Sequence, residues 1–263
     1  MRAGCAAVLV CLALGLGWAG AARGGFDGGT VVGAGEEAFG CTSRPGAIAR
    51  QGPAAADAAA GDPTARAVAG SEAASDEVAL TFDDGPSLTQ TPAILETLDR
   101  LGARATFFEE GRHVRGGEAL MRQILASGDE IGNHSWHHPI DPGEGELAST
   151  QQAIRAATGF TPCLFRPPFG ELDRKEQRAA RANGLELIFW TLDSEDDQHP
   201  GTGPIRARVL HRTKPGSIVL LHDGGRHPQT VEALPAIVEG LEARGLRLVT
   251  VTELLGGRML YRR

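Results

Sequence analysis

Two adjacent aspartates, Asp83 and Asp84, are the first residues in the sequence whose types and spacing suggest chemistry. They end the apolar run in EVALTFDDGP and are followed at once by a Gly-Pro pair. Like charges this close repel each other, so a structural reason must exist for keeping both at one strand end. The segment therefore raises the question of which role each of the two carboxylates has.

A second candidate segment, NHSWHHP, carries His134 and His138 four residues apart. On a helical turn this spacing directs both imidazoles the same way, which suits a divalent metal. An isolated HxxxH pattern is a weak signal, because solvated surface histidines produce it by chance. Combined with an aspartate such as Asp84 it makes a two-histidine, one-carboxylate set, which leaves coordination positions open for water and substrate. The neighbouring His137 has no assigned role.

Two further polar side chains interrupt apolar runs. Arg166 begins RPPFG, where two prolines fix the backbone, and His222 ends the buried run in LLHD. A histidine at such a position can act as a general acid or base. Taken singly, each has a plainer interpretation, a surface arginine and a hydrogen-bonded core histidine.

The elements that must position these residues begin after Asp76. Short apolar runs alternate there with segments of helical period that glycine closes, as in the helix expected to be capped by Thr91, to start at Pro92 and to end at Gly102. Strands alternating with helices predict βα units around a parallel sheet, and either a doubly wound sheet or a barrel fits. The seven expected strands are 78–82, 104–108, 130–133, 163–166, 187–192, 217–222 and 247–251.

The candidate residues share one location in this pattern, because each lies at the carboxyl end of an expected strand. In parallel α/β folds these ends form one rim, where active sites are built. Convergence of metal-ligand and acid–base residue types at five strand ends favours a functional site. The residues in strand order are Asp83 and Asp84, His134 and His138, Arg166, Asp193 and Asp196, and His222.

The N-terminal segment reads as a leader followed by a linker. Residues 1–22 have a basic start, an apolar stretch and small residues near Ala21, which predicts a cleaved secretory signal peptide and a secreted or cell-wall-associated protein. An uncleaved membrane anchor is the alternative. Residues 23–75 are rich in Ala, Gly and Pro and predict a disordered linker, and residues 76–263 form the expected catalytic domain.

Charge and cysteine content narrow the function only in part. The formal net charge of −7 over 263 residues, with no basic face, argues against nucleic-acid binding. Outside the leader, Cys41 and Cys163 remain, and a disulfide or two free thiols are both compatible with the sequence. No segment after the leader is long and apolar enough to span a membrane.

Five segments in order, TFDDGP, HSWHH, RPPFG, DSEDD and LLH, resemble the motifs of the polysaccharide deacetylase family, carbohydrate esterase family 4. The resemblance runs from about Asp76 to Leu255. It implies a distorted (β/α) barrel of about seven parallel strands, with fewer complete units than eight. It also implies removal of N-acetyl groups from a polysaccharide that contains N-acetylglucosamine, either peptidoglycan or a chitin-like oligomer.

The resemblance also implies a role for each residue. Asp84, His134 and His138 would bind the metal, which is usually Zn²⁺ in this family and can be another divalent ion such as Co²⁺. Asp83, paired with Arg166, would be the general base on the metal-bound water. The general acid would be His222, oriented by Asp196. The backbone N–H of Phe169 would stabilise the oxyanion, and Leu220 would shape the pocket for the acetyl methyl group.

Two positions depart from the family pattern. Asp197 stands where a tryptophan is usual, so an aromatic wall of the sugar groove is missing or comes from Trp136 or Trp190. Glu109 and Glu110 replace uncharged residues and are expected to be solvated, with lining of the rim as the alternative. Two other functions stay open, an O-acetyl esterase acting on xylan with the same site and a non-catalytic carbohydrate-binding protein. A monomer is expected.

Overall fold

The computed structural model describes residues 41–42, 67–71, 74, 76–171 and 173–259. The expected signal peptide and most of the expected linker lie outside these ranges. Ala67–Ser71 belong to the folded domain, several residues before the boundary expected at Asp76. Within the described residues, no helix has the length and apolar character needed to cross a membrane.

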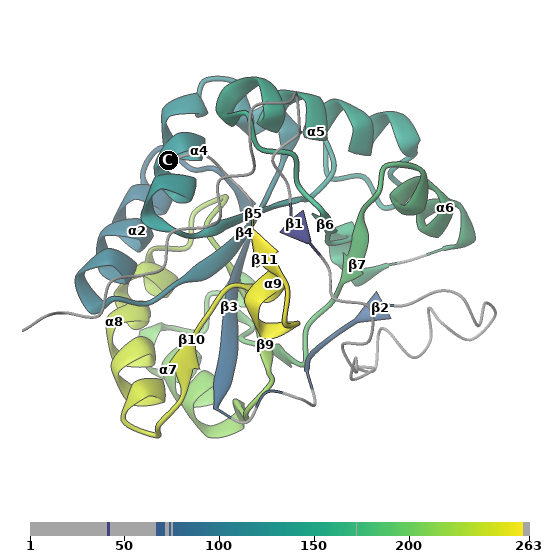
Figure 1. Cartoon of the computed structure of the whole chain (residues 1–263). Coiled ribbons are helices and arrows are strands. Elements are labelled where there is room, and N and C mark those ends of the chain that lie inside the picture. Colours follow the sequence, from purple (N-terminus) through teal and green to yellow (C-terminus); the bar gives the residue numbers. More distant parts are fainter. Residues whose placement is uncertain (1–40, 43–66, 72–73, 75, 172, 260–263) are drawn as a thin grey trace, which may run out of the picture.

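A parallel sheet forms the centre of the domain (Figure 1). Its strands pair in the order β2-β7-β6-β5-β4-β3-β9-β8, and β10 pairs with β3 beside this path. The strands are β2 (Ala67–Val68), β3 (Glu77–Gly85), β4 (Ala105–Glu109), β5 (Glu130–Asn133), β6 (Leu164–Phe165), β7 (Glu186–Ile188), β8 (Leu192–Asp193), β9 (Ile218–His222) and β10 (Arg247–Leu248).

The sheet curls into a barrel because its two ends are tied together by the chain. β7 and β8 lie near opposite ends of the strand order, yet only residues 189–191 separate them. Four Cα steps from Ile188 to Leu192 span at most about 14 Å. The sheet must therefore bend round until these strands approach each other, which confirms the distorted barrel.

Helices surround this barrel (Figure 1). Left-handed glycines at 102, 128 and 159 end the first three long helices, as the sequence predicts for 102 and 128. The helices are α2 (Gln90–Leu101), α3 (Gly111–Val114), α4 (Glu118–Ser127), α5 (Glu144–Thr158), α6 (Arg174–Ala182), α7 (Thr202–Arg212), α8 (Pro228–Glu242) and α9 (Val251–Leu254), with the 3₁₀ turns η1 (Pro168–Gly170) and η2 (Asp196–Gln198). The short strands β1 (Cys41–Thr42) and β11 (Arg258–Met259) pair with each other.

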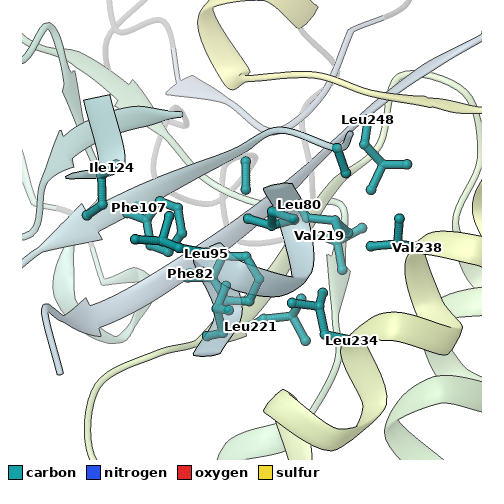
Figure 2. Packing of buried hydrophobic residues seen from close by; sticks show 14 of the residues in the cluster. Leu80, Phe82, Leu95, Phe107, Ile124, Val219, Leu221, Leu234, Val238 and Leu248 are labelled. Atoms are coloured by element: carbon teal, nitrogen blue, oxygen red, sulfur yellow. The ribbon is translucent and has the colours of Figure 1, made fainter. Parts of the chain in front are cut away.

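Alternation along β3 divides core from site. Leu80 and Phe82 face outward into the apolar layer beneath the helices, where Phe82 stacks on Phe107 of β4 with ring centroids 5.2 Å apart (Figure 2). Thr81 and Asp83 therefore face the barrel interior. Replacing Phe82 by alanine would remove about 3–5 kcal/mol of stability, so this layer fixes the position of β3.

Three sequence expectations about elements were wrong. The run 187–192 is not one strand, because Phe189–Thr191 cross from β7 to β8. The run 247–251 forms β10 only to Leu248, since Thr250 caps α9 by accepting from the Glu253 N–H. Thr91 is not a helix cap. α2 begins at Gln90, and the Thr91 hydroxyl donates to the buried Asp223 carboxylate instead.

Cys163 forms a disulfide, one of the two outcomes left open by the sequence. The expected partner is Cys41. The structure describes its backbone in β1, and its side chain lies outside the described part.

Candidate metal and acid–base site

The end of β3 sends its two carboxylates in different directions. Asp83 keeps the strand conformation and points into the barrel, whereas Asp84 lies at a register shift and has φ of 74°. A left-handed backbone is uncommon for aspartate and is strained. The left-handed conformation turns the Asp84 side chain away from that of Asp83. Asp83 therefore contacts Arg166, whereas Asp84 contacts two histidines.

Asp84, His134 and His138 bring three potential ligand atoms within 4.8 Å of one another. Asp84 Oδ1 lies 3.3 Å from His134 Nε2 and 3.4 Å from His138 Nε2. This oxygen is buried and lacks a hydrogen-bond partner among the described residues. A buried carboxylate oxygen facing two imidazole nitrogens is poorly satisfied by protein alone, so the set fits a divalent cation.

A backbone carbonyl, that of Arg166, fixes the orientation of the His134 ring. Its Nδ1 lies 2.7 Å from the Arg166 carbonyl oxygen, which can only accept, so Nδ1–H is the donor. Nε2 is thereby directed at Asp84, as in metal sites where a carbonyl holds the ligand tautomer. Burial opposes a charge on His134, but Asp83 and Asp84 raise its pKa. A proton and a metal cation therefore compete for this nitrogen.

The loop that carries the histidines is not a helical turn, contrary to the expectation. Residues 134–140 are irregular, with left-handed φ values of 64° at Ser135 and 58° at His138. The Ser135 hydroxyl accepts from the His138 N–H at 3.1 Å and closes the turn. Burial, followed by the charge of His134, lowers the pKa of His138 to about 4.

Asp83 is paired with Arg166, as the family resemblance implies. Arg166 Nη1 donates to Asp83 Oδ1 at 2.7 Å and to the Thr81 hydroxyl at 2.7 Å. The guanidinium is completely buried, donates to the Phe189 carbonyl and packs over the Phe108 ring at 4.2 Å. Because a buried arginine held on several sides cannot move, Asp83 has one fixed orientation with Oδ2 left for chemistry.

His222 and Asp196 form a second pair on the same rim. His222 Nδ1 lies 2.7 Å from Asp196 Oδ1, and the His222 backbone N–H donates to Oδ2 at 2.9 Å. Ser194 and Thr230 donate to the same carboxylate at 3.1 and 2.6 Å. Burial opposes a charge on the ring, but Asp196, with Asp83 and Asp84, raises the pKa of His222 to about 9. The imidazole is therefore protonated at neutral pH.

The four expected substrate-binding residues occupy different surroundings. Phe169 is 63% exposed, and its ring meets that of His138 at 4.5 Å between centroids. Leu220 is buried two residues before His222 on β9 and thus shares its face. Trp190 is half-buried and lies 5.5 Å over Arg166. Trp136 has its neighbours on α3 and α5, with Arg115 over its ring.

Glu109 and Glu110 are buried, which corrects the expectation that they are solvated. β4 continues through Glu109 between β3 and β5, and Glu110 precedes α3 and pairs with Arg112. Burial, then the negative charges of Asp223 and Asp83, raises the pKa of Glu109 well above its usual range. A protonated carboxyl is the form that such surroundings tolerate.

Several residues near the site were not predicted, because they do not sit at strand ends. Thr230 belongs to α8, and Gly224 follows β9, where a Cβ would lie 2.2 Å from the Asp84 carbonyl oxygen. His113, on α3, contacts that same oxygen through Nδ1 at 3.0 Å. The glycine after LLHD was the one signal available in the sequence.

Comparison with known proteins bears directly on this geometry. The family model described as polysaccharide deacetylase matches residues 70–188. A peptidoglycan-N-acetylglucosamine deacetylase of Bacillus cereus is 38% identical over 186 residues, which cover 68% of this chain and 87% of that protein. The chain belongs to the polysaccharide deacetylase family.

Two other relatives of this chain are also named as deacetylases. The enzyme PgdA of Listeria monocytogenes is 36% identical over 69% of this chain, and the match spans only 39% of that longer protein. A chitooligosaccharide deacetylase of Bradyrhizobium is 34% identical over 67% of this chain and 90% of its own length.

Two solved structures are similar to the fold. A family 4 carbohydrate esterase from Streptomyces lividans, in complex with acetate, has a TM-score of 0.65 at 34% identity, covering 72% of this chain and all of that one. A family 4 pseudoenzyme from Bacillus anthracis has a TM-score of 0.68 at 30% identity, covering 74% and 70%. The proteins of similar fold therefore include one named as an esterase and one named as a pseudoenzyme, so the fold alone does not establish catalysis.

Proposed function

We propose that the chain is a Zn²⁺-dependent hydrolase that removes N-acetyl groups from a polysaccharide containing N-acetylglucosamine. One observation carries the proposal. The three-ligand cluster, the Asp83–Arg166 pair and the His222–Asp196 pair all lie at carboxyl ends of strands of one barrel. A cation site between a base and an acid is the arrangement needed for amide hydrolysis.

Asp84, His134 and His138 would hold the cation. Their fit is supported by the unpartnered Asp84 oxygen and by the Arg166 carbonyl that directs His134 Nε2. A divalent cation at this position supplies Lewis-acid polarisation of the acetyl carbonyl and lowers the pKa of a coordinated water. Co²⁺ is compatible with the same ligand set, because geometry alone does not separate it from Zn²⁺.

Asp83 is the general base in this scheme. Its Oδ1 is occupied by Arg166, and Oδ2 lies 3.7 Å from His134 Nε2, beside the ligand cluster. Oδ2 accepts a proton from the attacking water as the water oxygen bonds to the acetyl carbon. Asp83 thus stays outside the ligand set, which gives the two adjacent aspartates separate roles.

His222 is the general acid. Asp196 occupies Nδ1, so the proton for transfer is on Nε2. An amine leaves the tetrahedral carbon only when its nitrogen is protonated, and a ring with pKa near 9 holds that proton at neutral pH. Cleavage of the C–N bond then yields acetate and the free amine. The Phe169 N–H would stabilise the oxyanion, and Leu220 would border the methyl group.

The substrate and location of the chain follow from its relatives as proposals. Those relatives are named for peptidoglycan and chitooligosaccharides, which favours a glycan of the cell wall or a chitin-like oligomer. We place the protein outside the cell, secreted or cell-wall-associated, with residues 1–22 as the signal. Trp190 is the aromatic residue that we assign to the sugar groove, because it lies against Gly170 at the rim.

Two alternatives retain a specific observation. The Streptomyces lividans neighbour is named an esterase, so O-acetyl groups of xylan are a second possible substrate. The Bacillus anthracis neighbour is named a pseudoenzyme, so a carbohydrate-binding role without catalysis is the third. The seven polar residues to which the resemblance assigns a metal-binding or acid–base role are all present, which favours catalysis in this chain.

Acetate release from N-acetylated chitooligosaccharide, peptidoglycan and acetylated xylan tests these functions in one experiment. The full chain is assayed with Zn²⁺, after chelation, and as Asp83→Asn. We expect Zn²⁺-dependent release from an N-acetylated substrate and a fall in kcat of about 10³ in Asp83→Asn, because general-base catalysis contributes about 10²–10⁴.

Asp99→Asn is the matched control, since Asp99 is an exposed aspartate on α2, away from the strand ends that form the site. Release from xylan alone would identify the esterase. Zn²⁺ binding without release from any of the three would support the binding protein, and release that survives chelation and Asp83→Asn would contradict the proposed site.

A further inference from the structure

We propose that His113 is a positioning residue for Asp84 and that it sets metal affinity by holding the ligand backbone in its left-handed conformation. The inference rests on the proposed metal site and assigns His113 no contact with substrate. It concerns a side chain that lies on a short helix, α3, outside the strand ends that supply the ligands.

The contact is a direct hydrogen bond. His113 Nδ1 lies 3.0 Å from the carbonyl oxygen of Asp84. A carbonyl oxygen only accepts, so Nδ1 carries the hydrogen and the tautomer is fixed. The carbonyl belongs to the residue with φ of 74°, at the register shift of β3. The donor therefore acts where the backbone leaves the ordinary strand conformation.

α3 also binds the segment that carries the other two ligands. The Gly111 N–H donates to the Ser135 carbonyl at 2.9 Å, and the Arg112 N–H donates to the Trp136 carbonyl at 3.2 Å. His113 is the next residue. One turn of helix thus joins the loop between His134 and His138 to the backbone of Asp84.

Gly224 also lies against the Asp84 backbone. A Cβ at this position would lie 2.2 Å from the Asp84 carbonyl oxygen and 2.4 Å from its Cβ. The Asp84 peptide is therefore in contact with both the loop after β9 and the His113 ring. Gly224 limits the space, whereas His113 supplies the directional bond that selects one peptide orientation.

The consequence concerns metal affinity more than folding. Without the His113 donor, the strained peptide can turn and carry the carboxylate away from the two histidines. Groups that orient a metal ligand from behind contribute about 10–100-fold to affinity. We expect about a tenfold loss of Zn²⁺ affinity, with the Asp83–Arg166 and His222–Asp196 pairs intact.

The test measures Zn²⁺ affinity of the full chain by chelator competition, for wild type, His113→Phe and His113→Asn. Phenylalanine keeps a ring but removes the donor, whereas the Asn Nδ2 amide can donate from nearly the position of His Nδ1. His211→Phe is the matched control, because His211 is exposed on α7. Urea unfolding of each metal-free variant is recorded alongside.

The expected result is weaker binding by about tenfold in His113→Phe, with His113→Asn restoring most of the affinity and His211→Phe unchanged. Equal affinity in His113→Phe and wild type would overturn the inference, as would equal losses in His113→Phe and His113→Asn. A loss confined to metal-free stability would assign His113 a structural role only. Failure of wild type to bind Zn²⁺ would instead contradict the proposed function.

Discussion

The two halves of the site differ in how far the protein satisfies its own carboxylates. On the acid side, both oxygens of Asp196 accept hydrogen bonds, from His222, Ser194 and Thr230. On the metal side, Asp84 Oδ1 is buried without a hydrogen-bond partner among the described residues, and its backbone is strained.

Under the proposed function, the difference matches what each half would need in order to work. A carboxylate that must orient and charge a histidine is complete within the protein, because every lone pair has a donor. A carboxylate that must take up a cation keeps an oxygen free of competing donors, so the cation supplies the missing partner. The comparison predicts that metal affinity is independent of Asp196.

The largest expected effect separates the two halves directly. Asp84→Asn removes the anionic ligand and should weaken Zn²⁺ affinity by at least about 100-fold, more than loss of an orienting group would. Asp196→Asn should leave Zn²⁺ affinity within about twofold of wild type, because it lies outside the ligand set. Isothermal titration measures both, and a comparable loss in the two variants would contradict the independence.

The second effect concerns catalysis on the acid side. Asp196→Asn removes the charge that raises the pKa of His222, so the alkaline limit of the kcat profile should move down from near pH 9. We expect kcat at pH 7.5 to fall by about 100-fold, because the ring loses both its orientation and its proton. A pH–rate profile measures this. An unchanged alkaline limit would show that another group is the acid.

A third effect is the pH dependence of stability. The pKa of His222 rises from its ordinary 6.5 to about 9 on folding, so its contribution is complete below about pH 6.5 and is lost as pH rises through about 9. We expect a loss of about 3 kcal/mol between pH 6.5 and 10 in metal-free protein, measured by urea unfolding. His222→Gln should lose that much less, and identical slopes would rule out the pair as the cause.

The smallest effect isolates one donor to Asp196. Thr230→Val keeps the shape of the side chain but removes the hydroxyl that donates at 2.6 Å, so unfolding free energy should fall by about 1–2 kcal/mol. Thr202→Val is the control, since that hydroxyl bonds Glu232 at the exposed surface. Equal changes in the two variants would mean that the acid side is no more tightly built than the surface.

The sequence predicted well which residues gather at one rim, because strand ends are visible in it. An apolar run that stops at Asp83, or at His222, locates a carboxyl end without any knowledge of partners. Parallel pairing then brings such ends to one rim. The Asp83–Arg166 pair at 2.7 Å confirms that expectation across 83 residues of chain.

The errors at Thr91 and at Glu109 have a shared physical cause, since both depend on contacts between distant segments. The sequence around Thr91 predicts a helix cap, but the Thr91 hydroxyl donates instead to Asp223, which follows a distant strand. Glu109 and Glu110 read as solvated because charge favours water, yet β3 and β5 pair on either side of β4 and enclose Glu109. The local sequence around these residues carries no information about such distant partners.

The sequence by itself determined which residue types stand at each strand end, and hence the class of chemistry available to this protein. Residue type and strand position are local properties, written in apolar runs and turn residues. The tertiary structure decided how these groups are held. The left-handed turn of Asp84, its support by His113 and Gly224, and the hydrogen bonds that complete Asp196 all come from segments far apart in the chain. Such support depends on packing geometry, because a hydrogen bond or a close contact exists only where folding brings two groups within about 3 Å.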